Sequence, residues 1–262
     1  MSNNNNFIHK LADVLRAVSG KTDKKYFTSA VILAAGSSTR MGGQSKQFIE
    51  LCGMPVVART ITAFDNSDCI DEIIVVCKKE EIDHYGDFVS LYGIKKPFKV
   101  VEGGATRQES ARCGVDAVHD KSKFIAIHDA ARCLITDEMI YKVCHGAYLH
   151  GGAVLATKAV DTVKIADKNA FIDSTPERKT VWQAQTPQVF KVNAFRAATY
   201  VARDEQFEGT DDASLLEHIQ IPVKLVEGNR ENLKVTEPLD IVIAEAILKY
   251  RENQLTKSEE QI

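Results

Sequence analysis

The residues best placed to do chemistry lie between Leu33 and Gln47, in the stretch LAAGSSTRMGGQSKQ. An apolar run leads into a loop that is rich in glycine and serine and that carries two cations, Arg40 and Lys46. Glycine lets backbone N–H groups approach a ligand closely, and successive N–H groups that face one way form a concave anion site. Arginine adds a planar fork of donors, and lysine adds a compact positive charge. The loop therefore predicts a polyphosphate site. The alternative is a strand-to-helix turn whose glycines and serines serve only steric needs.

This loop matches neither of the two commonest phosphate-binding patterns. No Gly-Lys-Ser/Thr follows its glycines, as the Walker pattern requires. Gly36 is followed by Ser-Ser-Thr-Arg, which breaks the Gly-x-Gly-x-x-Gly spacing of dinucleotide-binding folds. A polyphosphate site here would belong to another class of protein.

A second candidate loop spans residues 102–110 and reads EGGATRQES. Its paired glycines allow a ligand to approach the backbone, and Thr106 can cap a helix that begins after it. The free N–H groups at such a helix start suit a pyrimidine or a phosphate. A plain Gly-Gly turn followed by a helix cap is the alternative.

A third candidate loop, HDAARC at 128–133, directly follows an apolar run. Asp129 could bind a metal or accept hydrogen bonds from a polyol, and Arg132 could hold a phosphate with two parallel hydrogen bonds. The alternatives are a salt bridge between Asp129 and Arg132 and a packed, hydrogen-bonded His128.

The elements that would position these loops follow from the hydrophobic pattern. Continuous apolar runs at 30–35, 72–77 and 124–127 are typical of strands buried on both faces, and 106–118 has helical spacing. Alternating strands and helices predict an α/β fold in which helices cover both faces of a mostly parallel sheet. Ligands bind such sheets beyond the C-terminal ends of the strands. We therefore expect the loops 35–47, 102–110 and 128–133 to meet at one edge.

Residues 153–186 follow a different pattern. A strand at 153–156 is followed by two alternating segments, 162–165 and 171–175, with a turn at 167–169 between them. A lone two-stranded ribbon is marginally stable in water, so this arm, about 157–180, should pack on a partner subunit.

Bulk properties limit the classes of protein that fit. The chain has 262 residues, and its net charge of −3 argues against a general nucleic-acid binder. Its six cysteines are scattered, without a Cys-x-x-Cys pair, which is typical of reduced thiols in a cytoplasmic protein. No apolar run is long enough to span a bilayer, and no secretory signal is visible.

The ends of the chain differ from the middle. Residues 1–28 form an amphipathic N-terminal extension with apolar residues at helical spacing, namely Phe7, Ile8, Leu11, Val14, Leu15 and Val18. We expect a helix that packs on its own domain or on a dimer mate, and a helix lying on a membrane surface is the alternative. Residues 29–250 form the main domain, and 251–262 form a polar tail.

Taken together, LAAGSSTRMG with SKQF, the GG…R…S loop, HDAAR, WQAQTPQ and ENLKVT resemble the 2-C-methyl-D-erythritol 4-phosphate cytidylyltransferases of the non-mevalonate isoprenoid pathway. The resemblance covers about residues 30–250 and keeps the order of the family's motifs. It implies a three-layer, Rossmann-like nucleotidyltransferase fold with a mixed, mostly parallel sheet and a protruding β-arm that forms a homodimer. It also implies transfer of CMP from CTP to a polyol phosphate, with Mg²⁺ or another divalent cation as cofactor.

The resemblance also implies roles for individual residues. Arg40 and Lys46 would be catalytic, acting on the triphosphate. The CTP-binding residues would be Ala34, Ala35, Gly36, Gly104, Ser110 and Ala130. The acceptor-binding residues would be Asp129, Arg132, Lys234 at a strand end and, from the arm, Thr162 and Arg178. The residues that hold the metal stay open, and Asp211 and Asp212 are expected to cap a helix.

Two other functions stay possible, and the chain departs from the family's pattern at two positions. A ribitol 5-phosphate cytidylyltransferase usually has loops closer to LAGG and HDSVRP, and a catalytically silent nucleotide-binding homologue would be expected to lose Arg40 or Lys46. The family often has an acidic residue where Ala105 stands, and usually a proline where Cys133 stands.

Overall fold

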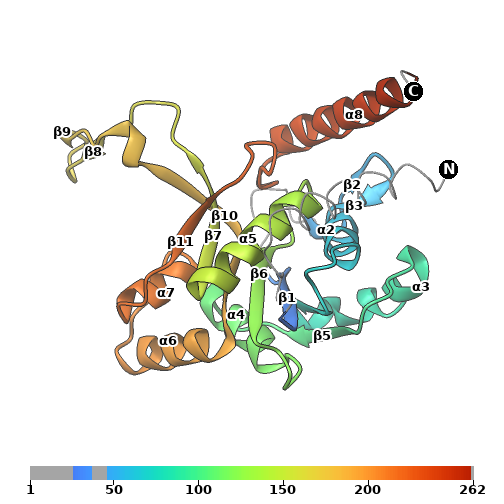
Figure 1. Cartoon of the computed structure of the whole chain (residues 1–262), viewed down its shortest axis with the longest axis horizontal. Helices are drawn as coiled ribbons and strands as arrows, with labels where there is room; N and C mark the ends of the chain where they lie inside the picture. The colour runs from blue at the N-terminus through green and yellow to red at the C-terminus, as the bar shows by residue number, and fades with distance from the viewer. Residues whose placement is uncertain (1–25, 37–45, 261–262) are drawn as a thin grey trace, which may run out of the picture.

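The computed structural model describes residues 26–36 and 46–260, without the side chains of residues 46, 255 and 257–260. In this part of the chain a seven-stranded sheet has the order β11-β7-β10-β6-β1-β4-β5 (Figure 1). Its strands are β1 (Thr28–Leu33), β4 (Glu72–Cys77), β5 (Phe98–Glu102), β6 (Phe124–Asp129), β7 (Gly152–Lys158), β10 (Trp182–Lys191) and β11 (Lys224–Glu227).

Most neighbouring strands of this sheet run parallel. β1 pairs in parallel with both β4 and β6, with Ala30 opposite Ile73 and Ala126, and β5 and β11 also pair in parallel with their neighbours. β10 runs antiparallel to both β6 and β7. The prediction of a mixed, mostly parallel sheet is confirmed. Because β1, β4 and β6 are in parallel register, their C-terminal ends lie together at one edge.

Helices cover both faces of the sheet, as predicted. The shorter elements around it are β2 (Glu50–Leu51), β3 (Met54–Pro55), β8 (Ile165–Ala166), β9 (Ile172–Ser174), η2 (Lys46–Phe48), η3 (Lys79–Tyr85), α3 (Phe88–Tyr92) and η4 (Arg178–Thr180). The longer helices are α2 (Val56–Asp65), α4 (Arg107–Asp116), α5 (Asp137–His150), α6 (Val192–Asp204), α7 (Asp212–His218) and α8 (Pro238–Glu260).

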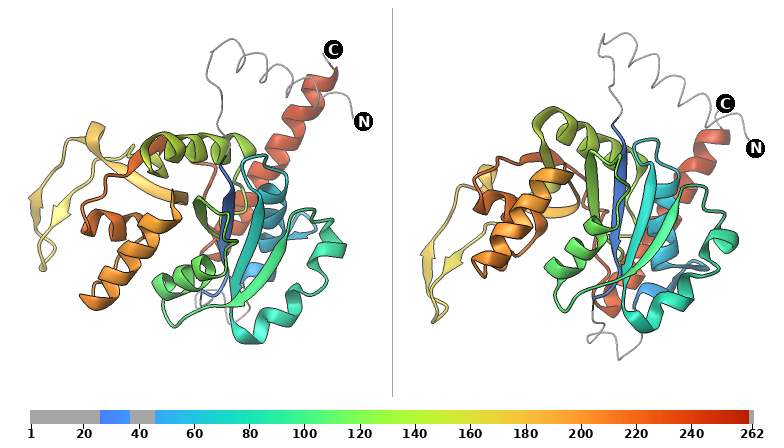
Figure 2. Two further views of the ribbon diagram at one scale, coloured as in Figure 1. Left: turned by 60° about the horizontal axis from the view of Figure 1, so that its bottom comes forward. Right: turned by 90° about the horizontal axis from the view of Figure 1, so that it is seen from below.

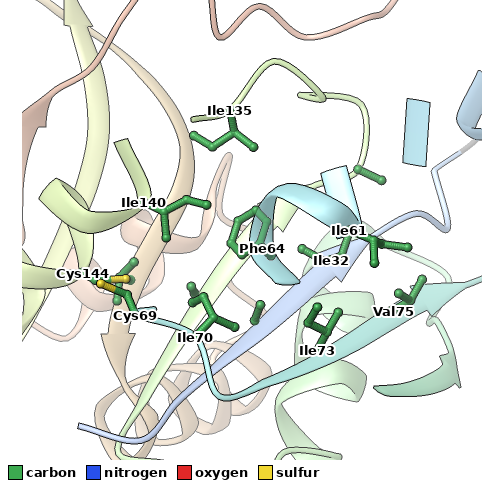
Figure 3. Close-up of a cluster of buried hydrophobic side chains, with 14 of the residues drawn as sticks. Ile32, Ile61, Phe64, Cys69, Ile70, Ile73, Val75, Ile135, Ile140 and Cys144 are labelled. Atoms are coloured by element: carbon green, nitrogen blue, oxygen red, sulfur yellow. The ribbon is translucent and has the colours of Figure 1, made fainter. Parts of the chain in front are cut away.

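Alternate residues of the central strands supply two separate cores. Ala30 and Ile32 of β1 belong to the core that α2 and α5 complete, whereas Val31 between them belongs to the core that α4, α6 and α7 complete. This period of two is the geometry of a strand whose successive side chains point to opposite faces. Figure 3 shows part of the first core, with Phe64 of α2 beside Ile32 and Ile61.

Helix α4 begins at a complete capping box and packs closely on the sheet. The Thr106 side chain accepts a hydrogen bond from the Glu109 N–H, and the Glu109 carboxylate accepts one from the Thr106 N–H. This confirms Thr106 as the predicted cap. Further along, a Cβ added to Gly114 would lie 2.3 Å from Cγ1 of Val31, so only glycine lets the helix approach β1 this closely.

The predicted arm projects from the body of the molecule between β7 and β10 (Figure 1). Its strands β8 and β9 pair antiparallel and are shorter than the expected segments 162–165 and 171–175. The expected turn between them is present, because the Asp167 carboxylate accepts hydrogen bonds from the N–H groups of Asn169 and Phe171.

The two ends of the chain complete the architecture. Of the amphipathic extension 1–28, the structure describes only 26–28, and Thr28 begins β1. Helix α8 continues to Glu260, so most of the segment assigned to a polar tail is helical. Among the described helices, none combines the length and the apolar content needed to cross a membrane.

Candidate active site

A pocket of about 390 Å³ opens at the edge where β1, β4, β5 and β6 end. All three loops that the sequence singled out contribute to it, which confirms that they meet. Its lining residues are Leu33, Ala35, Gly36, Gln47, Lys78, Gly104, Ala105, Thr106, Arg107, Ser110, Asp129, Ala130, Ala131 and Lys234.

Asp129, the last residue of β6, carries the pocket's central negative charge. Lys234 Nζ lies 2.8 Å from one of its carboxylate oxygens, and Arg107 Nε lies 3.3 Å from the other. Burial alone would raise the pKa of Asp129, but the charges of Arg107 and Lys234 outweigh that effect and hold the pKa well below its usual value. Asp129 is therefore ionised throughout the physiological range, and its two cations are held at the pocket wall.

Arg107 joins the pocket to α7 through a second carboxylate. Its Nη2 lies 2.7 Å from Oδ2 of Asp212, a residue that is 1% exposed. Burial raises the pKa of Asp212, and the Arg107 charge opposes that rise. One guanidinium thus holds two acidic side chains from separate elements, which fixes the start of α4 relative to β6 and α7.

A hydrogen-bonded chain under Asp129 fixes its backbone. The Asp129 N–H donates to the Thr186 hydroxyl at 3.0 Å, and that hydroxyl lies 3.0 Å from Nδ1 of His128. His128 Nε2 lies 3.2 Å from the Arg132 carbonyl and must donate to it, so Nδ1 accepts from Thr186. Burial lowers the pKa of His128 to about 3, so the ring is neutral. His128 is thus packed and hydrogen-bonded, which was the alternative interpretation of this residue in the sequence.

Arg132 is tied to the segment that precedes α8. Its Nη1 donates to the Asn232 carbonyl at 2.8 Å, and the Asn232 side chain donates to Gln185 and to the Thr186 carbonyl. Its Nε is buried and has no hydrogen-bond partner among the described residues. Burial lowers the pKa of Arg132, and the nearby Asp129 charge opposes that effect. The arrangement leaves one buried donor of Arg132 available to a further acceptor.

Small residues form the opposite wall of the pocket. Ala34 is held by its N–H to the Val76 carbonyl and by Gln47 Nε2, which donates to the Ala34 carbonyl. Ser110 Oγ lies 3.4 Å from the Gly104 carbonyl. A Cβ added to Gly103 would lie 2.8 Å from both Ala35 Cβ and Ser110 Oγ, so a larger residue there would push the two loops apart.

Comparison with known proteins decides the family of this chain. The family model of 2-C-methyl-D-erythritol 4-phosphate cytidylyltransferase matches residues 28–250. The chain belongs to this family. The curated 2-C-methyl-D-erythritol 4-phosphate cytidylyltransferase of Caldanaerobacter subterraneus is 43% identical, over 84% of this chain and 98% of the relative. That of Halalkalibacterium halodurans is 39% identical, over 86% and 99%.

Solved structures agree with this assignment. The crystal structure of 4-diphosphocytidyl-2C-methyl-D-erythritol synthase from Anaerococcus prevotii superposes with a TM-score of 0.79 at 32% identity, covering 86% of this chain and 97% of that one. The 2-C-methyl-D-erythritol 4-phosphate cytidylyltransferase of Thermus thermophilus gives 0.68 at 29% identity, over 85% and 99%. The chain is therefore a cytidylyltransferase with an α/β nucleotidyltransferase-like fold.

Most residues that the family resemblance proposed for the site lie around one pocket. Ala35, Gly36, Gly104, Ser110, Ala130, Asp129 and Lys234 line it, while Ala34 and Arg132 do not line it but directly adjoin lining residues along the chain. Arg40 lies outside the described residues. Lys46 begins η2, and its side chain lies outside the description as well. Thr162 and Arg178 lie exposed on the arm, and neither lines the pocket within one chain.

Two sequence-based expectations about these residues are wrong. Asp211 caps α7 as expected, but Asp212 does not cap it, because its carboxylate is buried against Arg107 instead. Lys234 lies in an irregular segment between β11 and α8 rather than at a strand end, and the next residue's N–H bonds to the Ala131 carbonyl.

Sequence reasoning also missed several site residues. Arg107 lies inside a loop that the sequence analysis selected. Its position at a capped helix start, close to two glycines, could have identified it as a residue of the site. Lys78 lines the pocket because it directly follows β4 at the same edge as the three loops. The rule that ligands bind beyond the C-terminal ends of parallel strands, which selected those loops, also selects Lys78.

Proposed function

We propose that this protein transfers CMP from CTP to 2-C-methyl-D-erythritol 4-phosphate, releasing pyrophosphate and forming 4-diphosphocytidyl-2-C-methyl-D-erythritol. One observation carries the proposal: the glycine-rich loop, the loop 102–110 and the Asp129 loop meet at a pocket in which Arg107 and Lys234 both contact Asp129. Family membership supplies the substrates. The names of the family model and of the relatives described above support methylerythritol phosphate as the acceptor.

The nucleotide would lie along the small-residue wall. Ala34, Ala35 and Gly36, together with Gly104 and Ser110, would hold the cytosine ring and the ribose, and Ala130 would approach the ribose from β6. Arg40 and Lys46 would neutralise the triphosphate. This assignment is supported by the closeness of the two loops, which leaves room for a flat ring only where side chains are small.

The acceptor would bind at the cationic side of the pocket. Asp129 would accept hydrogen bonds from the acceptor's hydroxyl groups, and Lys234 and Arg132 would hold its phosphate. The unpartnered, buried Nε of Arg132 supports this role, because such a donor requires an acceptor. In a homodimer joined through the arm, Thr162 and Arg178 would complete the acceptor site of the partner subunit.

The chemistry consists of positioning and charge stabilisation. The acceptor phosphate is already ionised at neutral pH, so its oxygen can attack the α-phosphorus of CTP without a general base. The neutral, internally bonded His128 is consistent with this, because it points to no proton transfer. Lysine and arginine donors would stabilise the charge that builds on the α-phosphate oxygens as pyrophosphate leaves.

A divalent cation fits this site only when the nucleotide helps to hold it. Asp129 is the carboxylate that lines the pocket, and the described residues contain no cluster of three or more potential metal ligands. Mg²⁺ commonly binds through one or two carboxylates together with substrate phosphates. Both oxygens of Asp129 are already paired with Lys234 and Arg107, so the phosphate oxygens of CTP would be the main ligands of the ion, which would neutralise their charge.

The state of the thiols supports a cytoplasmic location for the protein. All six cysteines are free, and four of them are buried, which favours a reducing, cytoplasmic environment.

The test is a direct assay. The pure protein is incubated with CTP, Mg²⁺ and one polyol phosphate at a time, and pyrophosphate release is measured together with the mass of the product. We expect turnover with 2-C-methyl-D-erythritol 4-phosphate and at least a hundredfold less with ribitol 5-phosphate. Equal or greater turnover with ribitol 5-phosphate would overturn the substrate assignment.

A further inference from the structure

Helix α8 is apolar on two opposite sides, and only one of them is covered in the part of the chain that the structure describes. Ile241, Ala244, Ile247 and Leu248 face the small core around Leu51 and Val56. On the other side, the exposed stripe consists of Leu239, Val242, Ile243, Ala246 and Tyr250. A helix that is apolar all round is normally buried all round.

The exposed stripe is continuous and substantial. Its members lie three, four, seven and eleven residues after Leu239, the spacing of neighbours along one side of a helix. Leu239 is 60% exposed, Val242 64% and Tyr250 58%. Figure 1 shows α8 extending away from the sheet. A contiguous apolar patch of this kind marks an interaction surface.

We propose that the chain's own N-terminal segment, residues 7–18, covers this stripe as an antiparallel or parallel helical partner of α8. The apolar residues of that segment lie on one side of a helix, and the side opposite carries Asp13 and Arg16. Twelve helical residues are about 18 Å long, and the stripe from Leu239 to Tyr250 is about 17 Å long. The two apolar surfaces therefore match in length.

The connection and the charges favour this occupant. Residues 19–25 are polar and, when extended, span up to about 26 Å between Val18 and Tyr26. Figure 2 shows in both views that β1 enters the sheet at the end toward which α8 rises. Residues 1–25 carry five cations and two carboxylates, whereas α8 carries five carboxylates and three cations, so their net charges are opposite.

An energetic argument points the same way. An isolated helix of twelve residues is marginal in water, so the segment gains helical structure only against an apolar partner. The described surface offers α8 as a partner of the right length and pattern. Docking would bury both stripes at once, and each buried methylene contributes about 0.8 kcal/mol.

Hydroxyl-radical footprinting of the full-length protein tests the proposal. Tyr250 of α8 and Tyr200 of α6 are matched reporters, because they are 58% and 63% exposed in the described structure. If residues 7–18 cover α8, Tyr250 should be oxidised at least threefold more slowly than Tyr200. In the variant Leu11→Lys/Leu15→Lys, the oxidation rate of Tyr250 should rise to that of Tyr200, while the oxidation rate of Tyr200 should stay unchanged.

Two results would overturn the proposal. Equal oxidation of both tyrosines in the unmodified protein would show that nothing covers the stripe. Protection of Tyr250 that persists in the lysine variant would assign the stripe to another occupant, and a lower mass of Val242→Lys/Tyr250→Lys by light scattering would identify that occupant as a second copy. The control variant Ala12→Lys/Arg16→Ala, which leaves the apolar side of the segment unchanged, should keep Tyr250 protected.

Discussion

At the scale of single residues, the site depends on cations held by buried acceptors. Arg107 bonds Asp129 and Asp212 at once, and Lys234 holds the second oxygen of Asp129. A guanidinium can bridge two carboxylates because its donors form a rigid fork, which a lysine cannot reproduce. These contacts fix positive charge at the pocket wall, so the reaction that we propose would need little reorganisation there.

The catalytic role proposed for Lys46 gives the first prediction. Lys46→Ala should lower kcat about 10²–10³-fold, because it removes one donor to the charge that develops on the phosphate oxygens. The melting temperature should stay within about 2 °C of the unmodified protein. Steady-state kinetics with CTP in excess measure kcat, and Lys79→Ala, on the exposed start of η3, is the control. Near-normal turnover would remove Lys46 from the mechanism.

The second prediction concerns the buried partner of Arg107. Arg107→Leu should lower the free energy of unfolding by about 3 kcal/mol, because the Asp212 carboxylate stays buried without its cation. Burial raises the pKa of Asp212 in the folded protein. The free-energy cost of burying the ionised carboxylate is therefore absent below the pKa of Asp212 in the unfolded chain, and it grows as the pH rises above that value. Urea unfolding at pH 5 and pH 8 should show the larger loss at pH 8.

Matched variants separate this charge effect from a simple loss of packing. Arg107→Leu/Asp212→Asn should recover most of the lost stability and its pH dependence, whereas Arg112→Leu on the exposed side of α4 should have little effect. A loss that is equal at both pH values, and that the second substitution does not restore, would contradict the buried-charge explanation.

The third prediction uses the neutral state of His128. Its folded pKa of about 3 lies below its ordinary value of 6.5, so the unfolded chain binds the proton more readily. Stability from this residue is therefore present above about pH 6.5 and is lost as pH falls. Between pH 7 and pH 5 the unmodified protein should lose about 2 kcal/mol more than His128→Gln, in urea unfolding followed by fluorescence. Equal losses would show that His128 is not buried neutral.

At the scale of elements, close contact between α4 and β1 positions the small-residue wall of the pocket. The fourth prediction is that Gly114→Ala destabilises the protein by about 1–3 kcal/mol, because the new Cβ would lie 2.3 Å from Val31 and 2.7 Å from Val76. The sign is informative, since alanine normally stabilises a helix interior relative to glycine by about 1 kcal/mol. Thermal unfolding measures the change, Arg112→Ala is the control, and a rise in stability would contradict the packing.

The sheet and the meeting of its loops could be predicted because buried parallel strands leave a strong signal. The run at 72–77 is buried throughout in β4, and the loops after β1, β5 and β6 meet because parallel register aligns their ends. Neither the pairing of Arg107 with Asp212 nor the irregular backbone at Lys234 could be predicted in this way. Both depend on contacts between segments about a hundred residues apart, which no local pattern encodes.

At the scale of the whole molecule, the role proposed for the arm implies that one chain alone makes an incomplete acceptor site. Thr162 and Arg178 lie exposed on the arm, away from the pocket of their own chain, and Phe171 and Ile172 there are 72% and 65% exposed. Exposed apolar residues on a short ribbon favour association with a second copy. In the symmetric dimer that we propose, the arms would cross, and each acceptor site would contain Lys234 from one subunit and Arg178 from the other.

The fifth prediction follows from this shared site. Arg178→Ala and Lys234→Ala should each raise the acceptor KM and leave weak activity at low acceptor concentration. When the two variants are unfolded, mixed in equal amounts and refolded together, half of the dimers should be hybrids in which one of the two sites carries neither substitution. Activity should then recover to about a quarter of that of the unmodified protein. Each variant refolded alone is the control, and the hybrid measurement separates a shared site from a local one. If both residues serve the same chain, every site in the mixture keeps one substitution, and no recovery can occur.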